Sequence, residues 1–415
     1  MCQHKNRNIV YKFMKPSVGA LLALAEKSPP ENEAVIERSY GKILSIMDSP
    51  LTVYQERGVH TLLQFYDPPL RCFIFVVFQL MPTLEEYSYL VGVLVKHQTP
   101  FYSTMGVLSS DQLAPALYLS KSWAEANFES KVSRSGFSLE SLLKRAHVAA
   151  DKGVWKDFNI LLALCIYGIV LFPKIPDFVD INAIPIFMVG DRVPTLLGYV
   201  YHFLHSRNYK GTGGVVNCCI PLLYMWFKNH LPCKGAFVAT QDSLSWAKRL
   251  MGLKSKDIRW YAAGLDWKDD EMIFGCGEFD SVTLMGIPGG INYNPCLVVR
   301  QLGFSLVGPL EDRFVKEALY YDVLQDTAAL QRAVRAWSHV RMKIKADLGK
   351  RDCVAHPDYE EWVKKRVECN GVPFPPEEPL YTHGPDFPID MSFSNFLKKA
   401  DANEKLREEN LDLNM

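Results

Sequence analysis

The chain has 415 residues, more than one typical domain, so it can bury a substantial core. Hydrophobic residues make up 48% of it and aromatic residues 12%, which excludes disorder over most of its length. Its 46 basic and 46 acidic residues cancel, so the whole chain lacks the positive charge that drives sequence-independent binding to nucleic acids or anionic membranes. The ten cysteines are scattered and no apolar signal opens the chain, which indicates a reducing, intracellular compartment.

Helical periodicity dominates the first 350 residues. Apolar residues recur three to four positions apart over residues 35–47 and again over 59–66. Two prolines after Asp67 end the second of these helices, because proline cannot continue a helix. Residues 72–79 are rich in β-branched and aromatic side chains, which predicts a strand after the turn.

Three features predict helices in the middle of the chain. Thr83 and Glu86 have capping-box spacing directly before an apolar helical pattern. Ser138 precedes a second such pattern as its cap. The most apolar stretch, residues 158–172, is shorter than the roughly 20 residues that span a bilayer as a helix. We expect a buried core helix there rather than a membrane or interfacial segment.

Prolines punctuate the next part of the chain. Those between Pro173 and Pro194 predict an extended or irregular stretch. Helical spacing returns at residues 196–204 and at 222–226, on either side of a Gly-rich turn. Both of these helices are expected in the core.

A small β element is expected near the end of the globular part. Its strands are residues 271–276 and 281–285, closed by a Gly-rich turn. Asn294 and Pro295 then form a natural cap and first helical residue. Residues 330–348 repeat apolar positions at four-three spacing, which predicts one helical packing seam.

The predicted fold is therefore mainly α, a large multi-helix globular domain with a small β element. The expected organisation is an N-terminal arm at 1–30, a helical domain at 31–350, a Pro-rich linker at 351–390 and a coiled-coil segment at 391–415. In that last segment, seven-residue repeats place polar and apolar residues at two core positions: Asn403, Asn410, Leu406 and Leu413. Two heptads predict only weak self-association, because a stable coiled coil sustains three or four.

The Gly-rich loop at residues 210–214 has two interpretations. Bare backbone amides in such a loop can cradle a phosphate. The loop lacks the Gly-Lys-Ser/Thr ending of a P-loop and follows no clear strand. We therefore favour a turn between helices over a phosphate site.

Histidines and cysteines gather in one region as candidate metal ligands. They are His202, His205, Cys218, Cys219, His230 and Cys233. Zinc sites usually show paired ligands such as Cys-x-x-Cys, and no two cysteines have that spacing. Buried thiols and capping or surface histidines are favoured over a metal site.

Charged clusters allow two further hypotheses. Acidic residues crowd into one segment and could hold magnesium for phosphoryl chemistry: Asp266, Asp269, Asp270 and Glu271. A solvated loop is favoured, because such carboxylates normally come from separate elements. Basic residues interleaved with aromatics at 207–210 and 332–350 could contact nucleic acid, although the second group is more simply the polar face of a helix.

Motifs for catalysis are missing. The chain has no Gly-x-Ser-x-Gly, no His-Glu-x-x-His and no lysine in a β-α-β setting suited to pyridoxal phosphate. We therefore assign no catalytic, cofactor-binding or metal-binding residue, and expect no cofactor.

Several blocks resemble the plant mobile domain family. Residues 66–73 and 78–87 are similar to its opening, with an apolar strand leading to a Thr-Leu-Glu-Glu helix start. Residues 211–232, 258–267 and 292–303 are similar to three later blocks, in the same order. The residues that carry this resemblance are Thr83, Glu86, Trp226, Trp260, Asn294, Arg300 and Gly303. The likeness is closest to a legume-type branch, a domain of unknown function found beside retroelement sequence.

The resemblance implies a transposon-derived or host-domesticated factor that acts in the nucleus, in silencing or development. It implies protein partners, phosphatase-like or chromatin-associated, and no established active site. We expect a non-enzymatic interaction protein with structural roles for Trp226, Trp260 and Arg300, the last fixing a helix by charge-assisted hydrogen bonds. The alternatives are a degenerate metal-dependent nuclease or transposase-like enzyme, and a cytoplasmic location.

Overall fold

The computed structural model describes residues 9–374 apart from short gaps. The gaps are 96–97, 99, 102–113, 115–116, 132–133, 191, 210, 212, 261–270, 287–288, 307–310 and 312–326. The predicted coiled coil at 391–415 and the linker from 375 onward therefore lie outside the described residues.

Seventeen α-helices are found in the described part, with one π-helix and one 3₁₀ helix. The helices are α1 (Gly19–Ala25), α2 (Pro30–Tyr40), α3 (Ile43–Met47), α4 (Val53–Gln64), α5 (Leu84–Val91), α7 (Lys121–Asn127), α8 (Leu139–Asp151), α9 (Trp155–Ile166), η1 (Tyr167–Leu171, π), α10 (Ala183–Val189), α11 (Arg192–Tyr209), α12 (Ile220–His230), α13 (Ala236–Ala239), α14 (Trp246–Met251), η2 (Ser255–Asp257, 3₁₀), α15 (Pro295–Gln301), α17 (Thr327–Trp337), α18 (Lys345–Leu348) and α19 (Pro357–Asn370).

Strands are short and form small sheets. They are β1 (Tyr11–Phe13), β2 (Tyr66–Asp67), β3 (Cys72–Ile74), β4 (Gln79–Leu80), β5 (Phe128–Lys131), β6 (Arg134–Ser138), β7 (Phe178–Asp180), β8 (Gly214–Val216), β9 (Glu271–Cys276), β10 (Val282–Gly286), β11 (Gly289–Tyr293) and β12 (Val340–Ile344). In the described part these strands make five sheets, ordered β1-β8, β10-β11, β12-β9, β2-β3-β4 and β5-β6-β7.

The prediction of a mainly α fold is wrong. Of the described residues, 53% are helical and 16% are in strands, an α/β mixture with several small sheets. Strands of two to six residues give too few alternations for hydrophobic periodicity to detect them. Six of the twelve described strands are also buried along their whole length, so they lack the alternating apolar and polar pattern of a half-exposed strand.

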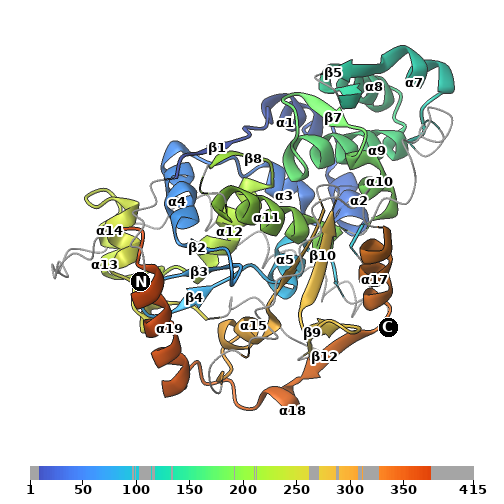
Figure 1. Ribbon diagram of the computed structural model, residues 1–415. Helices are drawn as coiled ribbons and strands as arrows, with labels where there is room; N and C mark the ends of the chain where they lie inside the picture. Colours follow the sequence, from blue (N-terminus) through green and yellow to red (C-terminus); the bar gives the residue numbers. More distant parts are fainter. Residues whose placement is uncertain are drawn as a thin grey trace, which may run out of the picture.

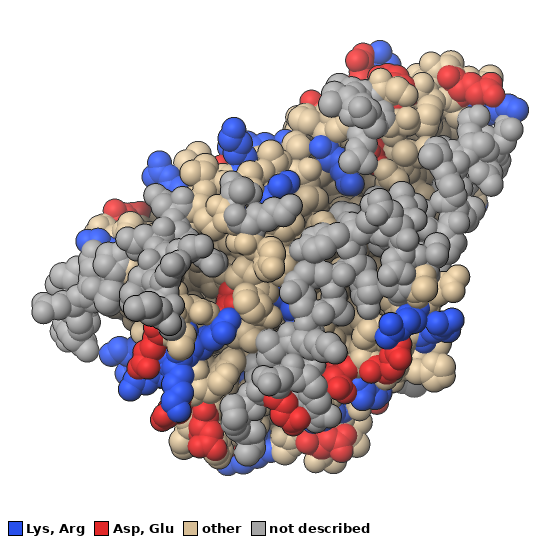
Figure 2. Space-filling model, viewed as in Figure 1, with Lys and Arg blue, Asp and Glu red and all other residues tan. Residues whose placement is uncertain are grey.

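The elements surround one large apolar core, beside which Met285 and Ala333 form a small second cluster. Figure 1 shows α7, α8 and α9 with β5 and β7 at one end of the molecule, and β9, β10 and β12 near the other. Helices α5, α11 and α12 lie between them. On the face drawn in Figure 2, basic and acidic side chains are interspersed, as the balanced total charge would suggest.

The apolar stretch at 158–172 is a buried helix, as predicted. Helix α9 buries eight of its 12 residues and continues into the π-helix η1, whose residues are all buried. Gly168 lies within η1, where a Cβ would stand 2.7 Å from Val179 of β7. Among the described residues no helix is both long and apolar enough to cross a membrane.

Two predicted segments between residues 72 and 194 differ from the structure. The single strand expected at 72–79 is a hairpin of β3 and β4, in which the backbone N–H of Phe75 donates to Phe78 O at 2.8 Å. The stretch around Pro185 and Pro194 is not irregular, because each proline is the third residue of a helix. Proline is tolerated in a first turn, where its missing N–H would have no intrahelical partner.

The packing seam predicted over residues 330–348 is not one helix. Helix α17 ends at Trp337, and β12 then pairs antiparallel with β9, with a bulge between Arg341 and Met342. Residues 271–276 and 281–285 are both strands, as predicted. They do not pair with each other, because β10 pairs with β11 and β9 pairs with β12. Pairing with the distant strand β9 therefore makes residues 340–344 a strand, although their local spacing predicts a helix.

The described chain has helices and strands at both ends, where the sequence predicts an arm and a linker. In the N-terminal part, β1 pairs parallel with β8, and α1 buries Leu21 and Leu24. The amide side chain of Gln64 accepts from Ile9 N at 3.0 Å and donates to Ile9 O at 2.8 Å, as a neighbouring strand would. In the C-terminal part, the segment expected as a linker contains α19, with Pro357 as its first residue.

Candidate functional site

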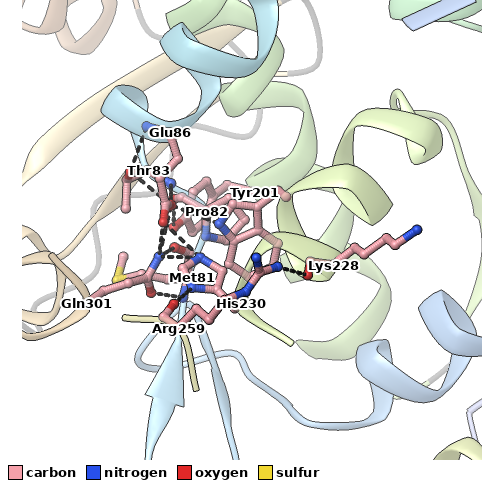
Figure 3. Close-up of polar contacts among 10 residues, drawn as sticks. Met81, Pro82, Thr83, Glu86, Tyr201, Lys228, His230, Arg259 and Gln301 are labelled. Atoms are coloured by element: carbon pink, nitrogen blue, oxygen red, sulfur yellow. Dashed lines mark hydrogen bonds and ion pairs between the residues drawn. The ribbon is translucent and has the colours of Figure 1, made fainter. Parts of the chain in front are cut away.

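A buried cluster of polar side chains surrounds the carboxylate of Glu86 (Figure 3). Trp226 Nε1 donates to Oε2 at 2.8 Å, and Gln301 Nε2 lies 2.9 Å from both oxygens. His230 Nε2 lies 2.8 Å from Oε1, and the side chains of the pair are only 1% and 4% exposed. We call Thr83, Glu86, Trp226, His230 and Gln301 the Glu86 cluster.

The cluster begins as an ordinary helix cap. Glu86 N donates to Thr83 Oγ1 at 3.1 Å, and Thr83 N donates to Glu86 Oε2 at 3.2 Å. This is the capping box that the Thr83 and Glu86 spacing predicts, and it is confirmed. The helix that follows, α5, ends at Gly92 in the left-handed conformation. What the sequence did not show is that the same carboxylate also binds three residues from distant segments.

His230 carries the charge that balances Glu86. Its Nδ1 lies 2.8 Å from Arg259 O, which can only accept a hydrogen bond. Its Nε2 faces the Glu86 carboxylate, so each ring nitrogen lies against an oxygen that accepts hydrogen bonds. Arg259 also donates to the carbonyls of Lys228 and Leu231, at 2.9 and 3.0 Å, and so closes the C-terminal end of α12.

The neighbours of Glu86 keep it ionised. Burial alone would raise the pKa of this carboxyl, but the His230 charge and the hydrogen bonds from His230, Gln301 and Trp226 together lower it. A lowered folded-state pKa means that the cluster stabilises the protein at neutral pH. This contribution is lost as the pH falls through the folded-state pKa.

Gln301 ties α15 to the segment that precedes α5. Met81 N donates to Gln301 Oε1 at 2.7 Å, and Gln301 Nε2 donates back to Met81 O at 2.6 Å. The side-chain amide therefore makes the two hydrogen bonds to the Met81 backbone that a neighbouring β-strand would make. Beside it, the hydroxyl of Tyr201 on α11 donates to Pro82 O at 2.7 Å. Residues 81–86 are thus held on both sides by helices.

Glu85 is adjacent to Glu86, but its surroundings raise the pKa of its carboxyl instead of lowering it. Its Oε1 accepts from Ile273 N of β9 at 3.0 Å. Its Oε2 is buried and has no hydrogen-bond partner in the described part of the chain. Burial raises the pKa of Glu85 to about 7, although the residue as a whole is only partly buried.

Replacing Glu85 with Gln should change how stability depends on pH. A raised folded-state pKa means that Glu85 contributes stability below its unfolded pKa, about 4.3, and loses it as the pH rises through about 7. Glutamine keeps the acceptor for Ile273 and cannot ionise. We expect urea unfolding at pH 8 to show the variant on the order of 1–3 kcal/mol more stable, with no such gain at pH 5. An equal shift at both pH values would contradict this assignment.

The other residues of the family resemblance lie on or beside α15. Asn294 caps this helix by accepting from Cys296 N at 2.9 Å, as its spacing before Pro295 predicts. Arg300 is 1% exposed and lies 3.7 Å from the ring centroid of buried Trp260. One hydrogen bond joins Arg300 to Cys353 O at 3.3 Å, so the cation–π contact, more than the predicted set of charge-assisted bonds, positions it.

Gly303 is required by its backbone. Its φ is +88°, and a Cβ there would lie 3.0 Å from both Arg351 Cγ and Cys353 Sγ. Its carbonyl accepts from Cys353 N at 2.9 Å, which brings the chain before α19 against α15. Any larger residue would strain this contact.

The candidate metal ligands are not brought together. No three His, Cys, Asp or Glu side chains in the described residues are grouped to hold a metal. Burial lowers the pKa of His202 and of His205 to about 4 and raises that of Cys219 to about 12, so these are ordinary buried side chains. Burial likewise raises the pKa of Cys218, Cys233 is exposed, and His230 belongs to the Glu86 cluster.

The structure describes only part of the remaining candidate sites. In the Gly-rich loop, Gly213 has φ +62°, and a Cβ there would lie 2.2 Å from Val10 O, which supports a structural turn against β1. Lys210 and Thr212 of that loop lie outside the described residues. So do three members of the acidic segment, Asp266, Asp269 and Asp270, and the coiled-coil residues Asn403, Leu406, Asn410 and Leu413. Glu271 is the first residue of β9.

Two cavities open side by side on the outer surface of α4. The first has a volume of about 340 Å³ and lies between β2 and the end of α19. The second, of about 560 Å³, lies between α4 and α14. Gln64 lines both, and the consecutive residues Pro373 and Phe374 line one each, so the two cavities adjoin; we call them together the α4 groove. Its other lining residues used below are Tyr54, Arg57, Asp67, Asp242, Ser243, Trp246, Arg366, Pro373 and Phe374.

Sequence reasoning missed the partners in these sites. The sequence indicates His230 as a candidate metal ligand and as part of a block that resembles the family, and Gln301 only as part of such a block; neither pattern predicts the contact with Glu86. Asp67, expected simply to precede a turn, accepts two bonds from Arg366, at 2.8 and 2.9 Å, that fix α19. A signal did exist for Gln301, because it and Arg300 are two polar residues at the end of a helix, 295–301, whose other residues are apolar.

One family model matches this chain, over residues 21–368, and it is described as a domain of unknown function (DUF7745). No curated protein matches the chain. No solved structure matches it either. The match covers every residue of the Glu86 cluster and the whole of α15.

Proposed function

The chain belongs to the DUF7745 family of domains of unknown function, and we propose that it is a non-enzymatic interaction protein. One observation supports this proposal above the others. The most elaborate polar cluster in the described structure is closed inside the core, where Glu86 and His230 are bonded to Thr83, Trp226, Gln301 and Arg259. Charged groups used in this way hold a scaffold together and have no free face for a substrate.

The scaffold joins segments that are far apart in the sequence. Gln301 and Glu86 are 215 residues apart, and Trp226 and Glu86 are 140 apart. Such bonds fix the relative positions of α5, α12 and α15 and therefore the shape of the surface above them. A rigid surface of defined shape suits the binding of another protein, because little conformational freedom is lost on association.

The proposal includes the origin and location expected from the sequence. The resemblance to plant mobile domains supports a transposon-derived or host-domesticated factor in the nucleus, acting in silencing or development. Its partners would be phosphatase-like or chromatin-associated proteins. Self-association through residues 391–415 would be weak, because two heptads are too few for a stable coiled coil.

The competing proposal is a degenerate metal-dependent nuclease. It is favoured by the acidic segment with Asp266, Asp269 and Asp270, whose side chains could ligate Mg²⁺. These residues are close in sequence and follow Trp260, which is a buried structural residue. Two experiments separate the proposals.

The first experiment is affinity purification of the tagged full chain from plant nuclei, followed by mass spectrometry. We expect defined proteins to copurify at near-equal amounts with the bait and to bind the purified chain directly. In the second, supercoiled plasmid is incubated with the full chain and Mg²⁺ or Mn²⁺. We expect equal, background nicking by the natural chain and by the Asp266→Asn, Asp269→Asn, Asp270→Asn variant. Metal-dependent nicking that the triple substitution abolishes would refute the binding-only proposal.

A further inference from the structure

The described chain ends inside the α4 groove. Phe374 lines the second cavity, and its ring packs 5.7 Å from the ring of Phe65, which lines the first. Pro373, directly before it, also lines the first cavity. The described chain therefore ends where the two cavities adjoin.

The position of this chain end is fixed by α19. Arg366 pairs with Asp67 through two hydrogen bonds, and Asn370 Nδ2 donates to the same carboxylate at 2.8 Å. Asp67 is 6% exposed, so this ion pair is shielded from solvent on one side. The helix cannot swing away from the groove without breaking these three bonds.

We propose that residues 375–381 bind back into the α4 groove. The segment reads Pro-Pro-Glu-Glu-Pro-Leu-Tyr. Its proximity gives it an advantage over any free ligand, because a directly attached segment has an effective concentration on the order of millimolar.

The lining of the groove suits a proline-rich segment. Such segments adopt an extended helix before binding, so they lose little entropy when they dock on aromatic surfaces. Tyr54 and Phe374 are partly exposed in the groove, and Trp246 lies beneath Tyr54 with ring centroids 5.0 Å apart. An extended segment leaves its carbonyls unpaired, and the exposed side chain of Ser243 on the opposite rim can donate to them.

Two charged residues that line the second cavity, Arg57 and Asp242, would orient the segment in the groove. Arg57 is exposed on the α4 side of the groove and pairs with no carboxylate in the described part of the chain. Asp242 is the one acidic residue that lines the second cavity, and it lies on the α14 side. Glu377 and Glu378 are therefore attracted toward α4 and repelled from α14. The segment would run along α4, with Leu380 over the second cavity.

Photo-crosslinking in the purified full chain tests this proposal. Leu380 is replaced by benzoylphenylalanine, the protein is irradiated, and crosslinked peptides are identified in the monomer band. We expect crosslinks to residues 54–64 and 241–247. Arg57→Glu should lower their yield roughly two- to fivefold, the effect of losing one exposed ion pair. Adding Glu377→Lys and Glu378→Lys to Arg57→Glu should restore it.

Lys144→Glu is the matched control, because Lys144 is an exposed basic residue on α8, away from the groove. It should leave the yield unchanged. Crosslinks to other parts of the chain, crosslinks between two chains, or a yield that Arg57→Glu does not change would each overturn the proposal. The assay contains no partner protein, so its failure would not bear on the interaction function proposed above. Failure of the affinity purification would likewise leave this result standing.

Discussion

Replacing His230 with Ala is expected to lower the free energy of unfolding by about 3–5 kcal/mol, because it leaves a buried carboxylate without its counter-charge. Glu86 and His230 are 4% and 1% exposed, so water cannot take over the lost interaction. Thr83, Trp226 and Gln301 would still donate hydrogen bonds, which keeps the fold but not its full stability. The measurement is urea unfolding at pH 7, followed by far-UV circular dichroism.

A double-mutant cycle separates this ion pair from general loss of packing. Glu86→Gln in the His230→Ala background should cost much less than Glu86→Gln alone, because the buried charge is then removed together with its partner. The exposed pair of Lys144 and Glu140, 2.6 Å apart on α8, provides the control. Lys144→Ala should change stability little, since exposed ion pairs are screened by water. Additive effects at Glu86 and His230 would contradict a coupled pair.

Replacing Trp226 with Ala is expected to cost about 3–5 kcal/mol of stability. Trp226 is 1% exposed, its ring lies 5.7 Å from that of Phe73, and its Nε1 donates to Glu86 at 2.8 Å. Trp226→Phe keeps most of the apolar volume but loses the hydrogen bond to a charged group. This variant should therefore cost less, about 1.5–3 kcal/mol.

Thermal and urea unfolding measure how much stability Trp226→Ala and Trp226→Phe each lose, and we expect the larger loss for Trp226→Ala. Val53→Ala on α4 serves as a surface control, because Val53 is 63% exposed and should stay within about 0.5 kcal/mol of the natural chain. If Trp226→Ala kept full stability but lost its copurifying proteins, Trp226 would be a binding anchor and its structural role would be wrong. Equal costs for Ala and Phe would show that the hydrogen bond, rather than packing, accounts for the effect.

The sequence predicted those features that depend on neighbouring residues. Thr83 with Glu86 forms the expected capping box, and Ser138 and Asn294 cap the expected helices. Residues 158–172 form the expected buried helix, because its long apolar run has few alternatives in a folded chain. In each case the cause lies within one or two helical turns, where spacing and side-chain chemistry are sufficient.

Features that depend on distant residues could not be predicted in this way. Residues 340–344 have helical spacing but pair with β9 as a strand, because β9 offers an open edge about 70 positions earlier in the chain. The Glu86 cluster likewise joins α5 to residues 140 and 215 positions away. A glutamate in a capping box shows no sign in the sequence of the histidine that neutralises it. Only its burial, which depends on the complete fold, makes the partner necessary.

The Glu86 cluster also has a consequence for synthesis on the ribosome. The chain emerges from its N-terminus, so Glu86 appears first, then Trp226 and His230, and Gln301 last. At about 5–20 residues per second, roughly 10–40 s separate the carboxylate from its last donor. During that interval α5 has its own cap but no stable place in the core. A nascent chain that stops before α15 therefore keeps a hydrated Glu86 and leaves exposed the apolar surface that α15 would cover, and such surface is what chaperones protect.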